Sequence, residues 1–524
     1  MIDSPRMAVL LVCCAVIGLM AFAWHNLSYA GFWWDEAAQF WIAQGLSNYA
    51  ESHAVPAGLG EVYRLNMEQN LDPGGFTLIE HFWTLANRQV AWIRTLPLSF
   101  LAVALAAAAA LGRMLSRSWL IAAAGFSLPL LYSGILYFGL ENRAYSMEMA
   151  GIVGGLVLLL LAMRKLTWWS FLLLGMYCAA FLSSRYSYIY FVACLFLALL
   201  FFRPGGRGAE SYRYYVNTAL CAFPIALSGL AIYFLMLSEQ LWPEMRGTGA
   251  LGISAPVYTQ GSVLKDNPDL SSLVWRNTLS PDALPITTAI VYYLFIHRWL
   301  HRWLRKRSGS GVDRTIATGV SVVLFFVLCY QCVSILFSGL GYYPWDIGSR
   351  WNAGLLIVSA VAALALTAEA NNLVRSSRIA GSGRWWEPGP VVATIVSMAA
   401  LFHTASYRLS RETPWVSVPD QLERLYKEDG WPGNTYVTFY EVPVVRYLYE
   451  YGPMRMRTEY PRAFRFETGR EYGSNSPIDA GGENIHFIIT AEGSRALGKR
   501  IAGRSLEPLG TGHPAPFLVI GGGS

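Results

Sequence analysis

Long apolar segments recur along most of the chain, and short polar segments separate them. Each holds roughly 17–25 residues, the length at which an α-helix crosses about 30 Å of hydrocarbon. The apolar segments lie at 7–24, 90–111, 119–138, 145–162, 167–183, 187–202, 215–237, 284–300, 316–338, 351–369 and 390–406. The pattern predicts an α-helical integral membrane protein with about 11 transmembrane helices, which together form one module over residues 1–406.

Basic residues gather in one set of alternating loops between these segments. They are Arg6, Arg113, Arg117, Arg164, Lys165, Arg203, Arg207, Arg213, Arg298, Arg302, Arg305, Lys306, Arg307, Arg314, Arg375, Arg378 and Arg384. Because basic loops stay on the cytoplasmic side, this pattern places the N-terminus inside and the tail after residue 406 outside. The net charge of +6 is largely this topology signal, so it does not indicate a nucleic-acid partner.

Composition supports the membrane assignment. Hydrophobic residues make up 54% of the 524 positions and charged residues 14%. Ordinary soluble domains carry about 25% charged residues, so the composition excludes a typical soluble enzyme.

The first apolar segment has a second interpretation as a cleaved signal peptide. It is short, and Ser28-Tyr29-Ala30 resembles a small-residue cleavage site. We favour an uncleaved span, because the other segments alternate correctly in either case. Asp35 lies outside the membrane under both interpretations.

The cysteines and histidines show no disulfide or metal pattern. The cysteines are Cys13, Cys14, Cys178, Cys194, Cys221, Cys329 and Cys332. All lie inside apolar segments, where they act as small hydrophobic side chains. His297 and His301 lie four residues apart in a basic loop, but no Glu of a zinc-type motif stands between them. We interpret both as interfacial residues of a helix end.

Two of the three longer external segments lie within the transmembrane module. Residues 25–89 are rich in turns, aromatic residues and acids. Residues 238–283 are irregular and punctuated by proline and glycine, so we expect a mobile loop that closes as a lid over a cavity at the membrane surface.

The third external segment, residues 407–520, is more polar. Strand-like and helical patterns alternate in it, with strands at 434–439, 484–490 and 517–520 and helices at 441–451 and 494–503. The alternation predicts a small extracytoplasmic α/β domain. Residues 521–524, Gly-Gly-Gly-Ser, resemble a linker.

An acidic pair, Asp35 and Glu36, follows two tryptophans just outside the first span. Residues 35–46 have the periodicity of a short amphipathic helix along the membrane surface, so Asp35 could simply be its N-cap and Glu36 could complement the helix dipole. Carboxylates are costly at a membrane boundary, however, which makes the pair a candidate catalytic site. Asp72 precedes a second amphipathic helix, which it could cap.

Three arginines stand at the outer mouths of spans, where the topology rule disfavours them: Arg143, Arg185 and Arg350. Each could be a snorkelling residue or an ion-pair partner. Three of them at one depth suggest an anionic ligand instead. A guanidinium suits phosphate because its planar fork of donors matches the oxygens, and a lipid phosphate is the natural candidate at that depth.

At these residues the chain resembles the C-type glycosyltransferases, multi-span enzymes that use polyprenyl-phosphate-linked sugars. Trp34-Asp35-Glu36 is similar to their acidic motif in the first external loop. Asp72-Pro-Gly74-Gly-Phe, followed by His81-Phe-Trp, resembles a Pro-Pro segment of the protein O-mannosyltransferase and aminoarabinose-transferase branch, with Gly74 in place of the second proline. Arg143-Ala-Tyr145 resembles the Arg-X-Tyr start of the fourth span in that branch. The resemblance covers roughly residues 5–190.

The resemblance implies an inverting single displacement at C1 of the donor sugar. Asp35 would act as general base, with Glu36 as the second catalytic carboxylate. The candidate substrate-binding residues are the motif residues Asp72, His81, Arg143 and Tyr145, together with Arg185, Tyr186 and Arg350 at the other outer mouths of spans. The arginines would hold the leaving phosphate, and Glu36 and Asp72 could position the sugar or an optional divalent cation. No cofactor is required.

The implied partners are a polyprenyl-phosphate sugar, membrane lipids, and a lipid, glycan or protein acceptor. A eukaryotic-type inserted domain is absent from the sequence, so we expect a bacterial inner membrane with the site facing the periplasm.

Other functions stay open at this point. A ligase or polymerase of cell-envelope polysaccharides would use a lipid-diphosphate donor and carry its key basic residues in a late external loop. A transporter of lipid-linked sugars would place charges near the midplane and show repeats. A non-catalytic assembly or sensor protein is a further alternative.

Overall fold

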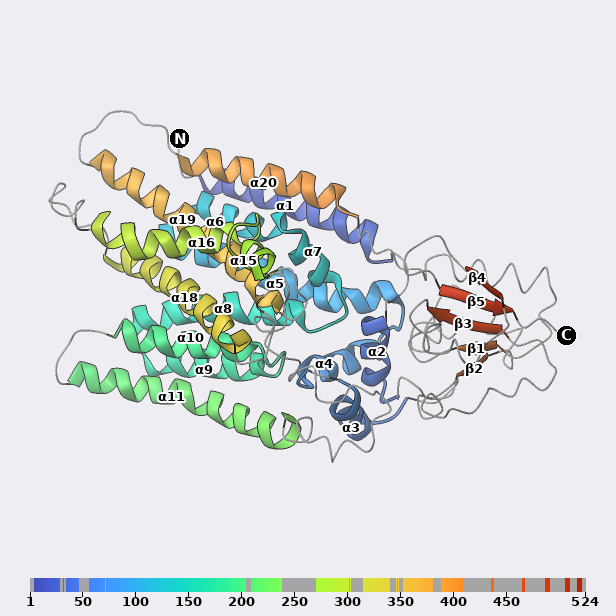
Figure 1. Cartoon of the computed structure of the whole chain (residues 1–524). Helices are drawn as coiled ribbons and strands as arrows, with labels where there is room; N and C mark the ends of the chain where they lie inside the picture. Colours follow the sequence, from blue (N-terminus) through green and yellow to red (C-terminus); the bar gives the residue numbers. More distant parts are fainter. Residues whose placement is uncertain are drawn as a thin grey trace. The chain divides into compact units, whose positions relative to one another are not determined.

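The structure is a computed structural model, shown in Figure 1. It describes residues 4–28, 32, 34–46, 56–70, 72–203, 209–237, 270–300, 302, 314–339, 345, 347, 352–379, 388–408 and the strands at 435–437, 464–466, 486–490, 505–508 and 516–520. The chain forms two compact units. The first, called here the bundle unit, comprises 1–24, 97–238 and 255–407. The second, the mixed unit, comprises 25–96, 239–254 and 408–524.

Helices build the bundle unit. They are α1 (Pro5–Asn26), α5 (Val90–Ser116), α6 (Trp119–Ser127), η1 (Leu128–Leu131), α7 (Ser133–Leu140), α8 (Tyr145–Lys165), α9 (Trp168–Leu182), α10 (Tyr188–Phe201), α11 (Ala209–Ile232), η2 (Tyr233–Leu237), α15 (Leu270–Thr278), α16 (Leu284–Val291), η3 (Tyr292–His297), α18 (Arg314–Gly339), α19 (Ala353–Ile379) and α20 (Pro388–Ser406). The first residues of α5 and the last of α1 belong to the mixed unit.

The prediction of an α-helical protein with several membrane spans is confirmed. Within the described residues, six helices are long and apolar enough to cross a membrane: α1, α5, α8, α11, α18 and α19. The helix pair α6–η1 and α7 adds a seventh span if the pair crosses as one, and α9, α10 and α20 are shorter apolar helices. Every predicted apolar segment thus coincides with a helix or helix pair, while the count of about 11 crossings stays a prediction.

The segment predicted as one span at 119–138 is not a straight helix. It bends by 77° between Leu131 and Ser133. Pro129 lies in η1, and Tyr132 is extended at φ −92° and ψ 112°. Because proline lacks an N–H donor and clashes with the preceding turn, the helix tightens there and breaks. Apolarity alone could not reveal this bend.

Helices α8 and α19 form the centre of the bundle unit. In each of them 78% of the most apolar stretch is buried, against 28% in α1 and 17% in α11. Small residues allow close packing elsewhere. A Cβ on Gly125 of α6 would lie 2.5 Å from the carbonyl oxygen of Ala108 in α5, so only glycine permits this approach. Helices α1 and α20 run side by side (Figure 1), and a Cβ on Gly18 would lie 2.3 Å from Thr404 Oγ1.

Three short helices and a sheet are described in the mixed unit. The helices are α2 (Trp34–Ala43), α3 (Leu59–Gln69) and α4 (Gly75–Thr84). The strands are β1 (Thr435–Val437), β2 (Phe464–Phe466), β3 (His486–Thr490), β4 (Ser505–Pro508) and β5 (Pro516–Ile520), in the order β2-β1-β3-β5-β4. Strand β1 pairs in parallel with β2 and β3, and β5 pairs antiparallel with β3 and β4.

Each of the three predicted strand runs overlaps a strand of this sheet, namely β1, β3 and β5. Strands β2 and β4, of three and four residues, lie in no predicted strand run. The helical patterns at 441–451 and 494–503 lie outside the described residues, so the α/β domain as a whole stays a prediction. Residues 238–269 of the predicted lid, Arg350, His301 and residues 521–524 also lie outside them.

The short helix expected over 35–46 forms as α2. Every residue from Asp35 to Leu46 is buried, because α3 and α4 pack against this helix. Helix α4 is amphipathic as expected. It exposes Ile79, Phe82 and Leu85 and buries polar residues such as Thr77 and Glu80.

Candidate functional site

The acidic pair lies in the first turn of α2. The helix begins at Trp34, so Asp35 stands inside the first turn rather than at the N-cap. Asp35 is 8% exposed and Glu36 is fully buried. Negative charge is favourable at this position because the free N–H groups of a helix start carry partial positive charge.

Glu36 forms a buried ion pair with Arg94 of α5. Arg94 Nη2 donates to Oε2 at 2.8 Å and Nε donates to Oε1 at 3.1 Å, so both carboxylate oxygens take part. Arg94 Nη1 also donates to the main-chain carbonyl of Leu27 at 3.3 Å, and the guanidinium carbon lies 5.8 Å from the ring centre of Phe32. The pair therefore ties the start of α2 to the start of α5 and fixes the backbone that carries Asp35.

Arg94 is not among the residues predicted for the site, although the sequence contains a signal for it. Arg94 lies in the predicted span 90–111. An arginine within an apolar helix needs an acidic partner, and the loop before this span carries several acids, Glu36 among them.

A buried polar network holds α2 against α3 and α4. Gln39 Nε2 donates to Thr77 Oγ1 and to Glu80 Oε2, at 3.0 Å each. Asn70 Nδ2 donates to Gln39 Oε1 at 3.1 Å and to Asn66 Oδ1 at 2.9 Å, and the Thr77 hydroxyl donates to the same Asn66 oxygen at 2.7 Å. A buried network with its partners in place makes its surroundings rigid. Helix α2, which carries Asp35, is thus held by the ion pair between Glu36 and Arg94 and by the hydrogen bonds of Gln39.

Asp72 and His81 contribute to this packing. Asp72 is buried, and its main-chain carbonyl accepts from Asn66 Nδ2 at 3.2 Å. The N-cap of α4 is Gly74, so Asp72 does not cap that helix. His81 Nδ1 donates to the carbonyl of Ala43 at 2.7 Å, which joins α4 to the end of α2. Since a carbonyl only accepts, this bond assigns the proton to Nδ1.

In the bundle unit, Arg143 and Tyr145 lie where α7 leads into α8. Arg143 is half-buried in the turn, and its main-chain N–H donates to the carbonyl of Glu141 at 2.6 Å. Tyr145 is the first residue of α8, and its ring centre lies 4.9 Å from that of Phe138.

Arg185 has an ion-pair partner in the same unit. Its Nη1 donates to Glu148 Oε2 at 3.2 Å, and both side chains are buried. The Ser187 hydroxyl donates to Glu148 Oε1 at 2.6 Å, and the Arg185 guanidinium carbon lies 4.6 Å from the ring centre of Tyr145. The structure thus brings Tyr145 and Arg185, two of the predicted substrate-binding residues, into contact. Tyr186, half-buried, precedes α10 in the same turn.

Glu148 is the residue that sequence reasoning missed here. It lies inside the predicted span 145–162, and an acid within a span was the available signal. The start of α19 approaches it closely. A Cβ on Gly354 would lie 2.3 Å from Tyr330 Oη and 3.3 Å from Glu148 Oε1. Glycine is therefore needed where α19 passes this carboxylate.

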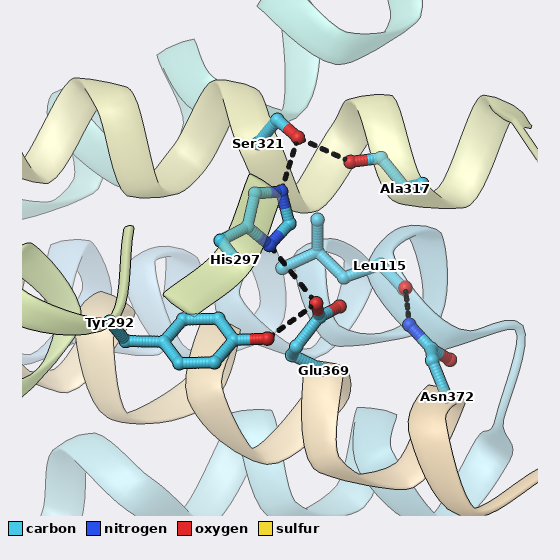
Figure 2. A network of polar contacts seen from close by, with 7 residues as sticks. All are labelled: Leu115, Tyr292, His297, Ala317, Ser321, Glu369 and Asn372. Atoms are coloured by element: carbon cyan, nitrogen blue, oxygen red, sulfur yellow. Dashed lines mark hydrogen bonds and ion pairs between the residues drawn. The ribbon is translucent and has the colours of Figure 1, made fainter. Parts of the chain in front are cut away.

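Figure 2 shows another buried polar cluster, which joins η3, α18 and α19. His297 Nε2 lies 2.7 Å from Ser321 Oγ, and Nδ1 lies 3.1 Å from Glu369 Oε1. The Tyr292 hydroxyl donates to the same Glu369 oxygen at 2.9 Å. Tyr292 and His297 are five residues apart and face one side because η3 is a π-helix, whose hydrogen bonds close five residues apart.

His297 is the last residue of η3, as expected for a helix end, but it is buried. Its side chain is 4% exposed. Its partner Glu369 lies in a different predicted span, so no local pattern connects the two.

Metal ligands do not cluster in the part of the chain that the structure describes. No group of three or more His, Cys, Asp or Glu side chains there is arranged to hold an ion.

Comparisons with known proteins give a likeness in fold. No protein-family model matches the sequence, and a search of curated proteins also finds no match. Among solved structures, ArnT from Cupriavidus metallidurans in the apo state aligns over 98% of this chain and 97% of its own, at a TM-score of 0.52 and 10% identity. The chain has the fold of ArnT.

A second ArnT structure, bound to undecaprenyl phosphate, aligns over the same shares of both chains at a TM-score of 0.50 and 12% identity. The archaeal oligosaccharyltransferase AglB from Archaeoglobus fulgidus, in complex with an inhibitory peptide and a dolichol-phosphate, aligns over 99% of this chain and 74% of its own, at a TM-score of 0.47 and 12% identity. The fold that the motif resemblance implies is thus the fold that the chain shares with ArnT.

Proposed function

We propose that this protein is a membrane glycosyltransferase. It moves a sugar from a polyprenyl monophosphate to a hydroxyl group of an acceptor on the non-cytoplasmic face. The observation that carries the proposal is the ArnT fold over nearly the whole chain, together with a carboxylate pair at the start of α2. ArnT is known with undecaprenyl phosphate bound, which supports a polyprenyl phosphate as the carrier here.

Asp35 is the general base in this proposal. The acceptor oxygen attacks C1 of the sugar and its proton passes to Asp35. The bond between C1 and the phosphate oxygen breaks, and polyprenyl phosphate leaves with the electron pair. A single displacement of this kind inverts the anomeric centre, through an oxocarbenium-like transition state.

Glu36 has a positioning role. Both of its oxygens bind Arg94 inside the protein, and taking up a proton would leave a buried guanidinium without its counter-charge. Glu36 therefore holds the first turn of α2 in place while Asp35 exchanges the proton.

The leaving phosphate needs cationic donors rather than an acid. Arg143 and Arg350 are the candidates, each worth about 1.5–3 kcal/mol as a charge-assisted hydrogen bond. Arg185 binds Glu148 and stacks on Tyr145, so we assign it the support of this region. Asp72, His81 and Tyr186 remain candidates for contacts to the sugar or the acceptor.

The test is a transfer assay with the purified full-length protein and labelled donors that differ in sugar and in linkage. We expect release of polyprenyl phosphate from a monophosphate-linked sugar, and loss of that release in Asp35→Asn. Turnover only of diphosphate-linked donors would favour a polysaccharide ligase or polymerase. Movement of intact donor across a vesicle membrane without release would identify a transporter.

A further inference from the structure

A cavity of about 290 Å³ lies among the ends of α8, α10 and α18 in the bundle unit. These three helices pack against one another (Figure 1). Its walls include Leu160, Arg164, Phe202, Thr318, Gly319 and Val322. All of these lie at the helix ends that the basic residues predict to be cytoplasmic. The cavity is separate from the residues to which we assign sugar transfer.

The wall of the cavity changes from polar to apolar with depth. Arg164 and Thr318 are exposed, whereas Leu160 and Val322 are buried. Leu160 precedes Arg164 by one helical turn and Val322 follows Thr318 by one turn. At 1.5 Å per residue, the apolar wall lies about 6 Å further into the span. This gradient matches a lipid, whose phosphate lies at the interface and whose acyl chains lie in hydrocarbon.

The Arg164 guanidinium is held at the cavity wall. Nη2 donates to the main-chain carbonyl of Met114, at the end of α5, at 2.8 Å. A Cβ on Gly319 would lie in ordinary contact with the same nitrogen, at 3.5 Å, so a side chain longer than alanine at this position would extend into the space beside the guanidinium. Lys165 and Arg203 each follow a cavity residue, and they add positive charge at the same helix ends.

We propose that this cavity binds one anionic phospholipid of the cytoplasmic leaflet. The phosphate lies at Arg164 and Thr318, and an acyl chain lies against Leu160, Phe202 and Val322. Basic pockets between transmembrane helices on the cytoplasmic side are suited to anionic headgroups because the guanidinium and the negative phosphate attract at the interface. A zwitterionic lipid offers the same chains without the net charge.

Native mass spectrometry of the full-length protein in detergent tests this assignment. Phosphatidylglycerol and phosphatidylcholine with identical chains are titrated separately. We expect one phosphatidylglycerol to be retained at least about tenfold more tightly than phosphatidylcholine, as a charge-assisted hydrogen bond allows. Arg164→Gln should remove this preference, while Lys165→Gln on the same helix should keep it. Equal retention of both lipids by the parent protein would overturn the proposal.

Two variants test the cavity itself. Gly319→Leu fills the space beside Arg164 and should abolish retention. Thr318→Trp at the exposed rim should close the mouth without entering the buried wall, so it keeps the test valid if the first variant unfolds. Phosphatidylglycerol bound at parental strength by either folded variant would refute the site. Displacement by glycerol 3-phosphate at equal concentration would identify a site for free anions and overturn the lipid assignment.

Discussion

Among the residues that the structure describes, each unit buries a carboxylate–guanidinium pair, and the two pairs are built differently. In the mixed unit Arg94 grips both oxygens of Glu36. In the bundle unit Glu148 divides its oxygens between Arg185 and Ser187, and Arg185 lies against the ring of Tyr145. The first pair locks two helix starts together through a guanidinium fork. In the second pair, the Glu148 carboxylate is shared between two donors, and the stability of the pair depends on Arg185, Ser187 and Tyr145.

The comparison teaches how a catalytic carboxylate can be supported. Buried ion pairs add little net stability, because desolvation offsets attraction, but breaking one leaves a buried charge alone. Glu36 and Arg94 therefore act as a rigid anchor beside Asp35. Glu148 has no acidic neighbour in the sequence that would correspond to Asp35 beside Glu36.

The sharpest test of this difference separates Asp35 from its neighbour. Asp35→Asn should lower turnover by about 10²–10⁴ while the melting temperature stays near that of the parent, because positioned proton transfer is lost and the shape is kept. Turnover in the transfer assay and thermal unfolding in detergent measure the two quantities. Normal turnover in well-folded Asp35→Asn would leave the carboxylate only its role in the first turn of α2.

Breaking either ion pair should destabilise the protein. Glu36→Gln and Glu148→Gln each leave a buried guanidinium without its carboxylate, at a cost of about 3–5 kcal/mol. Thermal unfolding of the purified variants measures the loss. A change below about 1 kcal/mol in either would show that the pair is not buried in the working protein.

Removal of both partners should distinguish the pairs. Replacement of Glu36 and Arg94 together by methionine should restore much of the loss, since no buried charge remains. The same double replacement at Glu148 and Arg185 should restore less, because the Ser187 hydroxyl then loses its acceptor. Equal recovery in the two units would contradict the distinction.

A milder change probes the guanidinium fork. Lysine keeps the charge but offers no planar pair of donors, so Arg94→Lys should cost about 1.5–3 kcal/mol, the value of one lost charge-assisted bond. Arg185→Lys should cost less, since an ammonium group can replace the hydrogen bond that Arg185 Nη1 donates to Glu148 Oε2 at 3.2 Å. A larger loss of unfolding temperature in Arg185→Lys than in Arg94→Lys would reverse the comparison.

The exposed ion pair of Glu61 and Arg64 on α3 should stabilise the protein less than either buried pair. The hydrogen bond from Arg64 holds the pKa of Glu61 below its ordinary value. The stabilisation is therefore present above pH about 4.3 and is lost as the pH falls through the lower folded-state pKa. Water screens this pair, so Glu61→Gln should cost at most about 0.5 kcal/mol at pH 7 and nothing at pH 2. Thermal unfolding at both values checks this, and a cost that persists in acid would have another cause.

The sequence alone determined that this is a membrane protein. The thickness of the hydrocarbon layer sets the length of the apolar segments, and that length can be read from the sequence. The sequence also predicted a helix at Asp35, three of the five described strands and the positions of the apolar helices, since these follow from local periodicity.

Only the tertiary structure decided the partners of the charged residues. Arg94 lies 58 positions from Glu36, Arg185 lies 37 from Glu148, and Glu369 lies 72 from His297. Periodicity reports which face of a helix is apolar, not which distant helix meets it. A buried charge requires a partner, but the packing of α2, α8, α10 and α19 selects which one. Packing against α3 and α4 buried α2, which its amphipathic pattern could not indicate.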